Sequence, residues 1–256
     1  MISILLTLFT FIFTTNMAFA EFFQDISSII KNNKERLSYG ISVTDFDKDG
    51  QFEFVVTGFR HPNLALSYKK GYLEDVNIDE VFSDDIRSTI GVAACDIDND
   101  GFEELYFLNT DTYSGQKQYS DRLLDNENAI IDLFQIEKNL KSLNLTAGRS
   151  VVCVDRNGLG RYGFYVANYG GPTRYYELIN NQIIDKAPML NIDKITGGRA
   201  VVSGHIIGEQ MDIFAANERG PNFLYFNENG TFRNFAEKLG VEDVFENGRG
   251  TTLTDF

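Results

Sequence analysis

The sequence has few of the residues that build transition-metal and nucleophilic sites. Its 256 residues include two histidines and two cysteines, and neither His61 nor His205 has a second ligand at the spacing of a zinc site. There is no Gly-x-Ser-x-Gly motif and no cysteine–histidine pair beside an orienting acid. These absences speak against a zinc enzyme and against the common nucleophilic hydrolases, so we expect no enzymatic activity.

Positive charge is also scarce. The chain has 23 lysines and arginines against 37 aspartates and glutamates, which gives a net charge of −14. A surface of this sign repels phosphate backbones. We therefore expect no nucleic-acid partner.

Long apolar runs are missing except at the start of the chain. Ile2–Phe13 is such a run, and Ala18-Phe-Ala20 follows it. This order is typical of a cleaved signal peptide, here residues 1–20, although its first residues include no Lys or Arg. The run is short for a bilayer span. We expect a secreted protein, or a periplasmic one in a Gram-negative bacterium, with no stable membrane span after cleavage.

Two segments that start 51 residues apart share one acidic pattern. They run Asp45-Phe-Asp47-Lys-Asp49-Gly50-Gln51-Phe-Glu53 and Asp96-Ile-Asp98-Asn-Asp100-Gly101-Phe102-Glu-Glu104. Calcium is a hard cation that takes about six to eight oxygen ligands, and a tightly turned loop can aim several carboxylates at one point. We therefore predict two Ca²⁺ sites, one in each loop.

These loops differ from the EF-hand. An EF-hand has a glutamate at position twelve and a helix on each side, whereas position twelve is Val56 in one loop and Phe107 in the other. The flanking residues are β-branched and aromatic, as in Ile41–Val43, so both loops connect strands. The predicted ligands are the side chains of Asp45, Asp47, Asp49 and Glu53 with the carbonyl of Gln51, and the side chains of Asp96, Asp98, Asp100 and Glu104 with the carbonyl of Phe102.

The acidic loops belong to a repeat of about 50 residues. Each unit opens with a glycine, then has a strand, the loop or its remnant, a second strand, a turn and a hairpin. The opening glycines are Gly40, Gly91, Gly148, Gly198 and Gly248. Four strands per unit predict an all-β fold, a β-propeller of four-stranded blades. We expect no calcium in the third unit, where Gly163 holds the ninth position, or in the fourth, which keeps only Asp212.

The ends of the chain resemble parts of the first unit. Thr251–Phe256 is similar to Ser42–Phe46, the entry into an acidic loop, and residues 22–27 are similar to the last strand of the first unit. We therefore expect residues 21–256 to be about four and a half blades of a longer propeller. Residues 22–27 would form the outer strand of the blade that closes the ring.

The loops resemble the FG-GAP and VCBS repeats of integrin-α-like propellers. Longer stretches resemble the cartilage acidic protein family, which has bacterial relatives of the ASPIC/UnbV type. They are Val43–Gly50, Gly91–Gly101, Glu104–Thr110, Gly148–Arg156 and Gly220–Phe226. The resemblance implies a secreted, calcium-binding propeller of seven blades, usually followed by an ASPIC/UnbV domain, with a non-enzymatic role in extracellular matrix and receptor binding.

Two interpretations of function follow. The first is an exported calcium-binding module for adhesion or matrix-type interaction, whose partner is an extracellular protein or glycan. The alternative is a lectin for extracellular polysaccharide or an enzyme that degrades it, because acids outside the loops are numerous enough to supply a glycosidase pair.

Two further sets of residues leave alternatives open. Cys95 and Cys153 precede neighbouring loops, and the repeat alignment puts them one position apart, so a disulfide and a buried free thiol are both possible. Arg149, Arg199 and Arg249 each follow an opening glycine. They could gather as an anion site at one mouth of the propeller axis, or each could pair with an acid of the next blade.

Overall fold

The computed structural model describes residues 23–76 and 78–254, so the predicted signal peptide and Asp255 lie outside the described residues. Its strands are β1 (Ile41–Thr44), β2 (Glu53–Val56), β3 (Leu64–Lys69), β4 (Tyr72–Asp75), β5 (Thr89–Cys95), β6 (Glu104–Asn109), β7 (Arg122–Asn126), β8 (Ile130–Asp132), β9 (Gly148–Val154), β10 (Gly163–Pro172), β11 (Arg174–Ile179), β12 (Gln182–Asp185), β13 (Ile195–Gly204), β14 (Asp212–Asn217), β15 (Phe223–Glu228) and β16 (Thr231–Asn234). The short helices are η1 (Ser27–Ile29), α1 (Glu80–Ser83), η2 (Leu133–Gln135), η3 (Glu137–Ser142) and α2 (Ala236–Leu239). The expectation of an all-β chain is confirmed.

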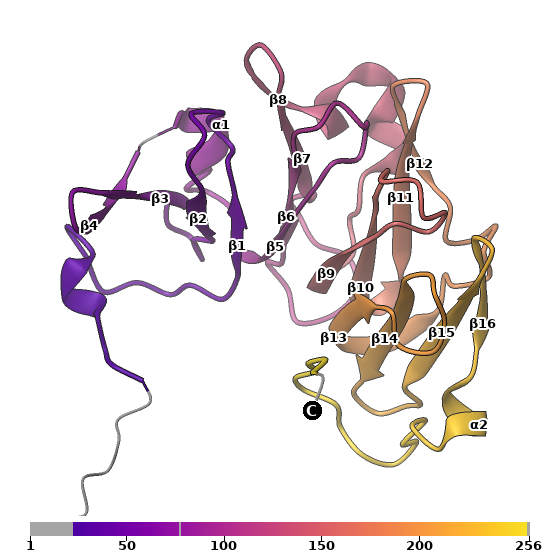
Figure 1. Ribbon diagram of the computed structural model, residues 1–256. Helices are drawn as coiled ribbons and strands as arrows, with labels where there is room; N and C mark the ends of the chain where they lie inside the picture. The colour runs from indigo at the N-terminus through magenta and orange to yellow at the C-terminus, as the bar shows by residue number, and fades with distance from the viewer. Residues whose placement is uncertain (1–22, 77, 255–256) are drawn as a thin grey trace, which may run out of the picture.

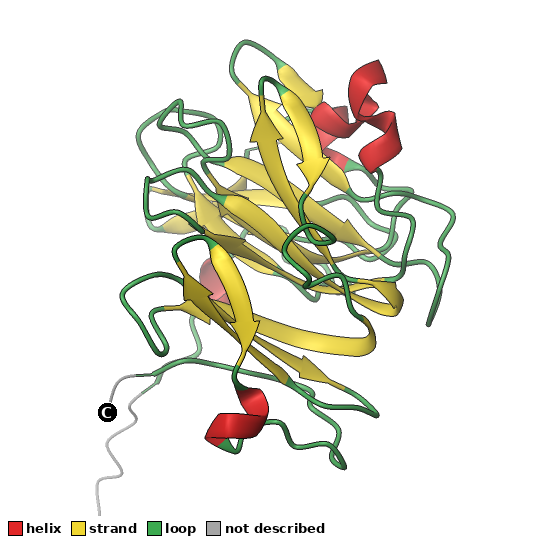
Figure 2. Ribbon diagram, turned by 90° about the vertical axis from the view of Figure 1, so that its right-hand side faces the viewer, coloured by secondary structure: helices red, strands yellow, loops and turns green. Residues whose placement is uncertain are grey.

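The strands form four antiparallel meanders in chain order. The first is β1-β2-β3-β4 and the second is β5-β6-β7-β8. The third, β9 to β12, and the fourth, β13 to β16, join into one sheet because β10 also pairs with β13. Figure 1 shows the first meander to one side of the other three, and Figure 2 shows the short helices outside the sheets.

The core lies between successive meanders. Along β6 every side chain is buried, and neighbouring side chains point to opposite faces because the side-chain period of a strand is two. Leu105 and Phe107 pack with Val55 of the first meander, whereas Tyr106 packs with Phe164 of the third. The second meander is therefore covered on both faces, which is why the middle of β6, Leu105–Leu108, is continuously apolar.

Several opening glycines of the repeat lie close against residues of a neighbouring repeat. β1 contacts β5, β5 contacts β9, and β9 contacts β13. A Cβ atom added to Gly40 would lie 2.8 Å from the Cα of Gly91, and one added to Gly198 would lie 2.7 Å from the carbonyl oxygen of Asn168. Only glycine leaves room for this contact, which gives the periodic glycines a physical cause.

A disulfide bond joins Cys95 at the end of β5 to Cys153 in β9, with their Cα atoms 6.0 Å apart. The alternative of free thiols is therefore wrong. The repeat alignment compares positions within equivalent sheets, whereas the bond joins two different meanders, so a one-position offset does not keep the sulfurs apart. The bond links the strands that lead into the second and third loops.

Residues 23–26, part of the segment expected to form an outer strand, have no regular structure here, and Ser27 begins η1. That strand is expected to pair within the blade that closes the ring, so its formation stays a prediction. The Asp25 carboxylate accepts a hydrogen bond from the Ser27 amide at 2.8 Å, which favours a turn over an extended strand. Farther on, Ile30 forms an isolated parallel bridge with Leu73 of β4.

At the other end, Gly248 donates a hydrogen bond to the Asn217 carbonyl at 2.9 Å, but residues 248–254 form no strand. None of the helices in the described residues is long and apolar enough to span a bilayer.

Candidate cation sites

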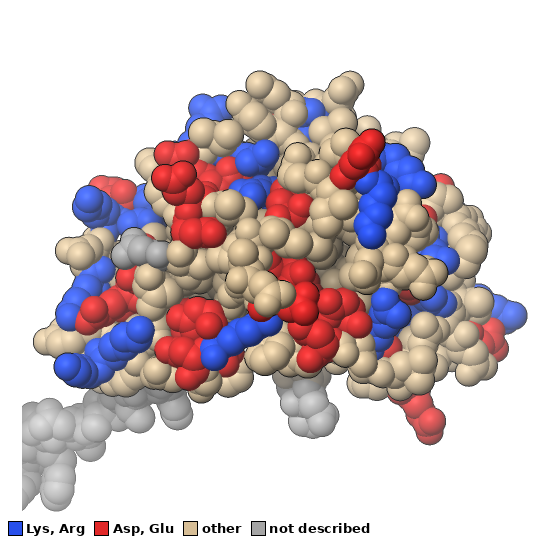
Figure 3. All heavy atoms as spheres, turned by 90° about the horizontal axis from the view of Figure 1, so that it is seen from above, with Lys and Arg blue, Asp and Glu red and all other residues tan. Residues whose placement is uncertain are grey.

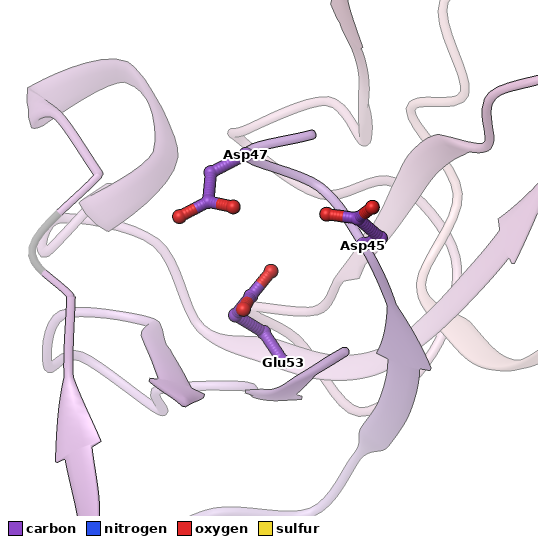
Figure 4. Close-up of side chains that lie close together, drawn as sticks. All are labelled: Asp45, Asp47 and Glu53. Carbon is purple, nitrogen blue, oxygen red and sulfur yellow. The ribbon is translucent and has the colours of Figure 1, made fainter. Parts of the chain in front are cut away.

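The two acidic loops connect the first and second strands of the first two meanders. In the first loop, Asp45 and Asp47 point toward Glu53, which begins β2 (Figure 4). One carboxylate oxygen from each of the three lies within 4.8 Å of the others. The second loop brings Asp96, Asp98 and Glu104 together within the same distance. Each loop thus offers three converging carboxylates, the donor set that a hard divalent cation prefers.

Backbone geometry explains why these loops turn so tightly. Gly50 and Gly101 have φ angles of 85° and 93°, a region that favours glycine. Their amides donate hydrogen bonds to the first aspartate of each loop, Asp45 and Asp96, both at 3.0 Å. The glycine at position six therefore folds the loop back over its own first ligand.

Glu53 is the most informative residue of the first loop. It is fully buried, and neither of its carboxylate oxygens has a hydrogen-bond partner. Burial raises the pKa of Glu53, and the charges of Asp47 and Asp49 raise it further, whereas the nearby amides of Phe46 and Asp47 lower it without forming full hydrogen bonds. A buried carboxylate without a full hydrogen bond or a counter-charge is strongly destabilising. A bound cation would supply the missing charge.

Glu104 has the same place in the second loop and is 2% exposed. One of its oxygens accepts a hydrogen bond from the Ile97 amide at 2.8 Å. Burial raises the pKa of Glu104 to about 8, and Asp98, Asp125 and Asp100 also raise it. The second loop therefore concentrates more negative charge than one backbone amide can offset.

The structure leaves two predicted side-chain ligands outside these groups. Asp49 accepts a hydrogen bond from the Gln51 amide at 2.9 Å, and Asp100 accepts one from the Phe102 amide at 2.8 Å. Each carboxylate thus accepts a hydrogen bond from the amide two residues farther along its own loop. The roles of the Gln51 and Phe102 carbonyls stay predictions.

The third loop has a different arrangement at the position of the buried glutamate. Asp155 accepts hydrogen bonds from the amides of Asn157 and Gly160 at 3.2 and 2.7 Å. At the ninth position, a Cβ atom on Gly163 would lie 2.7 Å from the hydroxyl oxygen of Tyr175. This hydroxyl donates to the Val154 carbonyl at 3.0 Å. A tyrosine thus fills the space that a glutamate occupies in the first two loops.

The fourth loop keeps an acid at the ninth position but surrounds it with donors. Asp212 is fully buried. Its carboxylate accepts hydrogen bonds from the amides of Ile207 and Asn227, both at 2.7 Å, and from that of Gly208 at 3.5 Å. Unlike Glu53, this carboxylate is stabilised by the protein itself.

The sequence did not reveal two acids beside the second loop, Asp125 and Glu127. Leu105 pairs with Leu124, so Asp125 lies beside Glu104 on the neighbouring strand. Burial raises the pKa of Asp125, and Asp98 and Glu127 also raise it. Asp125 could have been identified from the pairing register of β6 and β7. The connection between these two strands is long, so the sequence alone does not specify that register.

A direct contact between the two loops was also missed. The ammonium group of Lys48 in the first loop lies 3.9 Å from the centre of the Phe102 ring in the second. Nearby, the Asn126 side chain donates to the Phe46 carbonyl at 2.6 Å. The two candidate sites are therefore neighbours whose loops contact each other. Figure 3 shows acidic side chains gathered in patches on one face of the molecule, with Lys and Arg among them.

Two solved structures are similar to part of the chain. The V. cholerae biofilm matrix protein Bap1 aligns with 77% of this chain and 30% of its own, with 16% identity and a TM-score of 0.39. The rhamnogalacturonan lyase YesW aligns with 76% of this chain and 50% of its own, with 12% identity and a TM-score of 0.36. These scores are too low for either structure to define the fold.

Sequence comparison is more specific. Residues 38–107, which include both acidic loops, match the FG-GAP-like repeat family. Cartilage acidic protein 1 of Xenopus tropicalis is 45% identical over 252 residues, which cover 88% of this chain and 39% of that protein. The human protein is 43% identical and is covered to 38%. The chain thus spans about two fifths of the length of these curated relatives. Over that span, it is a homologue of cartilage acidic protein 1 and carries an FG-GAP-like repeat.

Proposed function

We propose that the chain is an exported, non-enzymatic interaction module whose first two loops bind Ca²⁺. The observation that carries this proposal is the buried Glu53 carboxylate, which converges with Asp45 and Asp47 and has no hydrogen-bond partner. The repetition of the same three-acid geometry around Glu104 supports it.

Calcium would act here as a structural ion. The loops follow the ends of β1 and β5, two of the innermost strands, and they contact each other through Lys48 and Phe102. A cation that neutralises the converging carboxylates would hold the first two meanders in a fixed relation. We propose that the four meanders are blades of a β-propeller and that the ordered surface binds an extracellular protein or glycan.

The disulfide bond supports export. Disulfides persist in oxidising compartments and are rare in reducing ones, and Cys95 and Cys153 are bonded across two meanders. The proposed export signal is residues 1–20. Extracellular calcium modules bind with dissociation constants of about 10⁻⁴–10⁻³ M, a range in which a secreted module would be loaded.

The test is calcium titration of the chelator-treated chain by isothermal calorimetry, with scanning calorimetry at each end point. We expect two bound ions and a melting temperature that rises with calcium concentration, because a ligand of the folded state stabilises it by mass action. Asp45→Asn should remove one ion, whereas Asp85→Asn, at an exposed acid, should remove none. A melting temperature that is the same in calcium and in chelator would contradict the proposal.

A further inference from the structure

Four arginines gather around one carboxylate at the opposite end of the inner strands from the acidic loops. Arg149 follows the first residue of β9, and the third loop starts after the last residue of that strand. Seven strand residues separate the two ends by about 20 Å. The cluster is therefore distinct from the candidate cation sites. Its members are Arg149, Arg199, Arg219 and Arg249, with Glu218 among them.

Positive charge exceeds negative charge in this cluster. Glu218 is the carboxylate with which Arg199 and Arg249 form ion pairs, and no ion pair of Arg149 or Arg219 occurs in residues 23–76 and 78–254. The hydrogen bond from Arg199 holds the pKa of Glu218 below its usual value, and Arg249 and Arg219 also lower it. One ionised acid faces four guanidinium groups in a chain whose net charge is −14. Such a local excess attracts anions.

Two tyrosines hold the buried half of the cluster in place. The guanidinium carbons of Arg149 and Arg199 lie 5.4 and 4.8 Å from the centre of the Tyr169 ring, and both lie 5.5 Å from that of Tyr113. Arg149 also donates to the Thr110 hydroxyl at 3.0 Å. Its Nε atom is buried without a hydrogen-bond partner. Two like charges are thus fixed side by side, a geometry that needs an anion for full compensation.

The other half of the cluster is accessible. The Arg249 side chain is 67% exposed, and its contact with Glu218 is long, at 3.5 Å. Tyr113 is 61% exposed, so part of its ring is open to a ligand. A guanidinium fork matches a carboxylate in a bidentate manner, and an aromatic ring beside it offers a flat apolar surface with a polar edge.

We propose that this arginine cluster binds the carboxylate of an acidic sugar, with Arg249 as the accessible fork and Tyr113 as the surface on which the sugar ring packs. This proposal deepens the proposed function, because it names a ligand class for the interaction module. An acidic sugar uses both features of the cluster, because its carboxylate matches the guanidinium fork and its ring can pack on the open face of Tyr113. Arginine clusters also recognise acidic peptides, so a poly-glutamate peptide is the competing ligand in the test.

The test measures binding of a glucuronate-containing hexasaccharide by calorimetry, in calcium and in chelator. We expect binding in calcium that salt weakens, and at least a tenfold loss of affinity in Arg249→Ala. Arg233→Ala is the matched control, because Arg233 is also 67% exposed and also pairs with one glutamate. It should leave the affinity unchanged. Free glucuronate, as the second source of the same carboxylate, should bind more weakly than the hexasaccharide.

Tyr113→Ala separates sugar recognition from simple charge attraction. We expect it to weaken hexasaccharide binding at least fivefold and to weaken the binding of a poly-glutamate peptide of equal charge by a smaller factor, because Arg249, the accessible fork, pairs with Glu218 and not with Tyr113. The proposal is overturned if the hexasaccharide does not bind, if Arg233→Ala and Arg249→Ala lose affinity equally, or if poly-glutamate binds as tightly as the sugar. Each of these results would leave the calcium-dependent melting temperature unaffected, so a failure here is distinct from a failure of the cation sites.

Discussion

The first and fourth loops place a buried acid at the same point of the repeat, but they differ in the hydrogen-bond donors that surround its carboxylate. Asp212 receives three backbone hydrogen bonds, whereas Glu53 receives none. Both residues are fully buried. Burial of an acid therefore does not by itself indicate a cation site. The informative observation is a buried carboxylate that lacks hydrogen-bond donors.

The largest effect is expected for Glu53→Gln and Glu104→Gln. Each should remove one bound calcium ion, because an amide is a weaker ligand than the carboxylate it replaces at the point where three carboxylates converge. Without calcium the same variants should melt at a higher temperature than the parent, because a buried charge has gone. The measurement is calcium titration paired with scanning calorimetry in chelator.

Asp212→Asn is the matched control for this first prediction. Its carboxylate has protein donors, so the variant should keep both calcium ions. If it lost an ion, or if neither glutamine variant did, the distinction between the loops would fail.

The second prediction concerns the pH dependence of the calcium-free chain. Glu104 has a pKa of about 8 in the folded state against an ordinary value of 4.5. Because the folded state favours the protonated acid, its contribution to stability is fully present below pH 4.5 and is lost as the pH rises through about 8. We expect the free energy of unfolding in chelator to fall by a few kcal/mol over this window.

Urea unfolding at several pH values measures this slope. Glu104→Gln should flatten it in chelator, and saturating calcium should flatten it in the parent chain, because the ion holds the carboxylate ionised. A parent chain without calcium that is equally stable at pH 5 and pH 8 would contradict the assignment.

The third prediction concerns the stability of the fourth loop itself. Asp212→Asn replaces an acceptor of three amides by a group with one acceptor oxygen and places an NH₂ group against a backbone donor. We expect a loss of about 1–3 kcal/mol in the free energy of unfolding, equal in calcium and in chelator. Urea unfolding under both conditions measures it, and a loss that appears only in calcium would show that this loop also holds an ion.

The sequence was sufficient for the parts of the fold that depend on local pattern. The spacing of acids and glycines placed Asp45 and Glu53 at one point, and the β-branched and aromatic residues beside the loops indicated that the loops connect strands. Local pattern was insufficient wherever the contact joins two meanders. The Cys95–Cys153 bond and the insertion of Tyr175 beside Gly163 both depend on register and packing between strands that the chain order does not specify.

The smallest effect is expected for the contact between the first two loops. Phe102→Leu removes the ring over which Lys48 lies at 3.9 Å but keeps the charge and the backbone of the second loop. An exposed cation–π contact contributes about 0.5–1 kcal/mol, so we expect calcium affinity at the second site to fall by about two- to fivefold. Phe52→Leu is the matched control, because Phe52 is also an exposed aromatic of an acidic loop. Calorimetric titration of both variants measures their calcium affinities. An equal loss of affinity in the two would mean that the contact between Lys48 and Phe102 does not couple the sites.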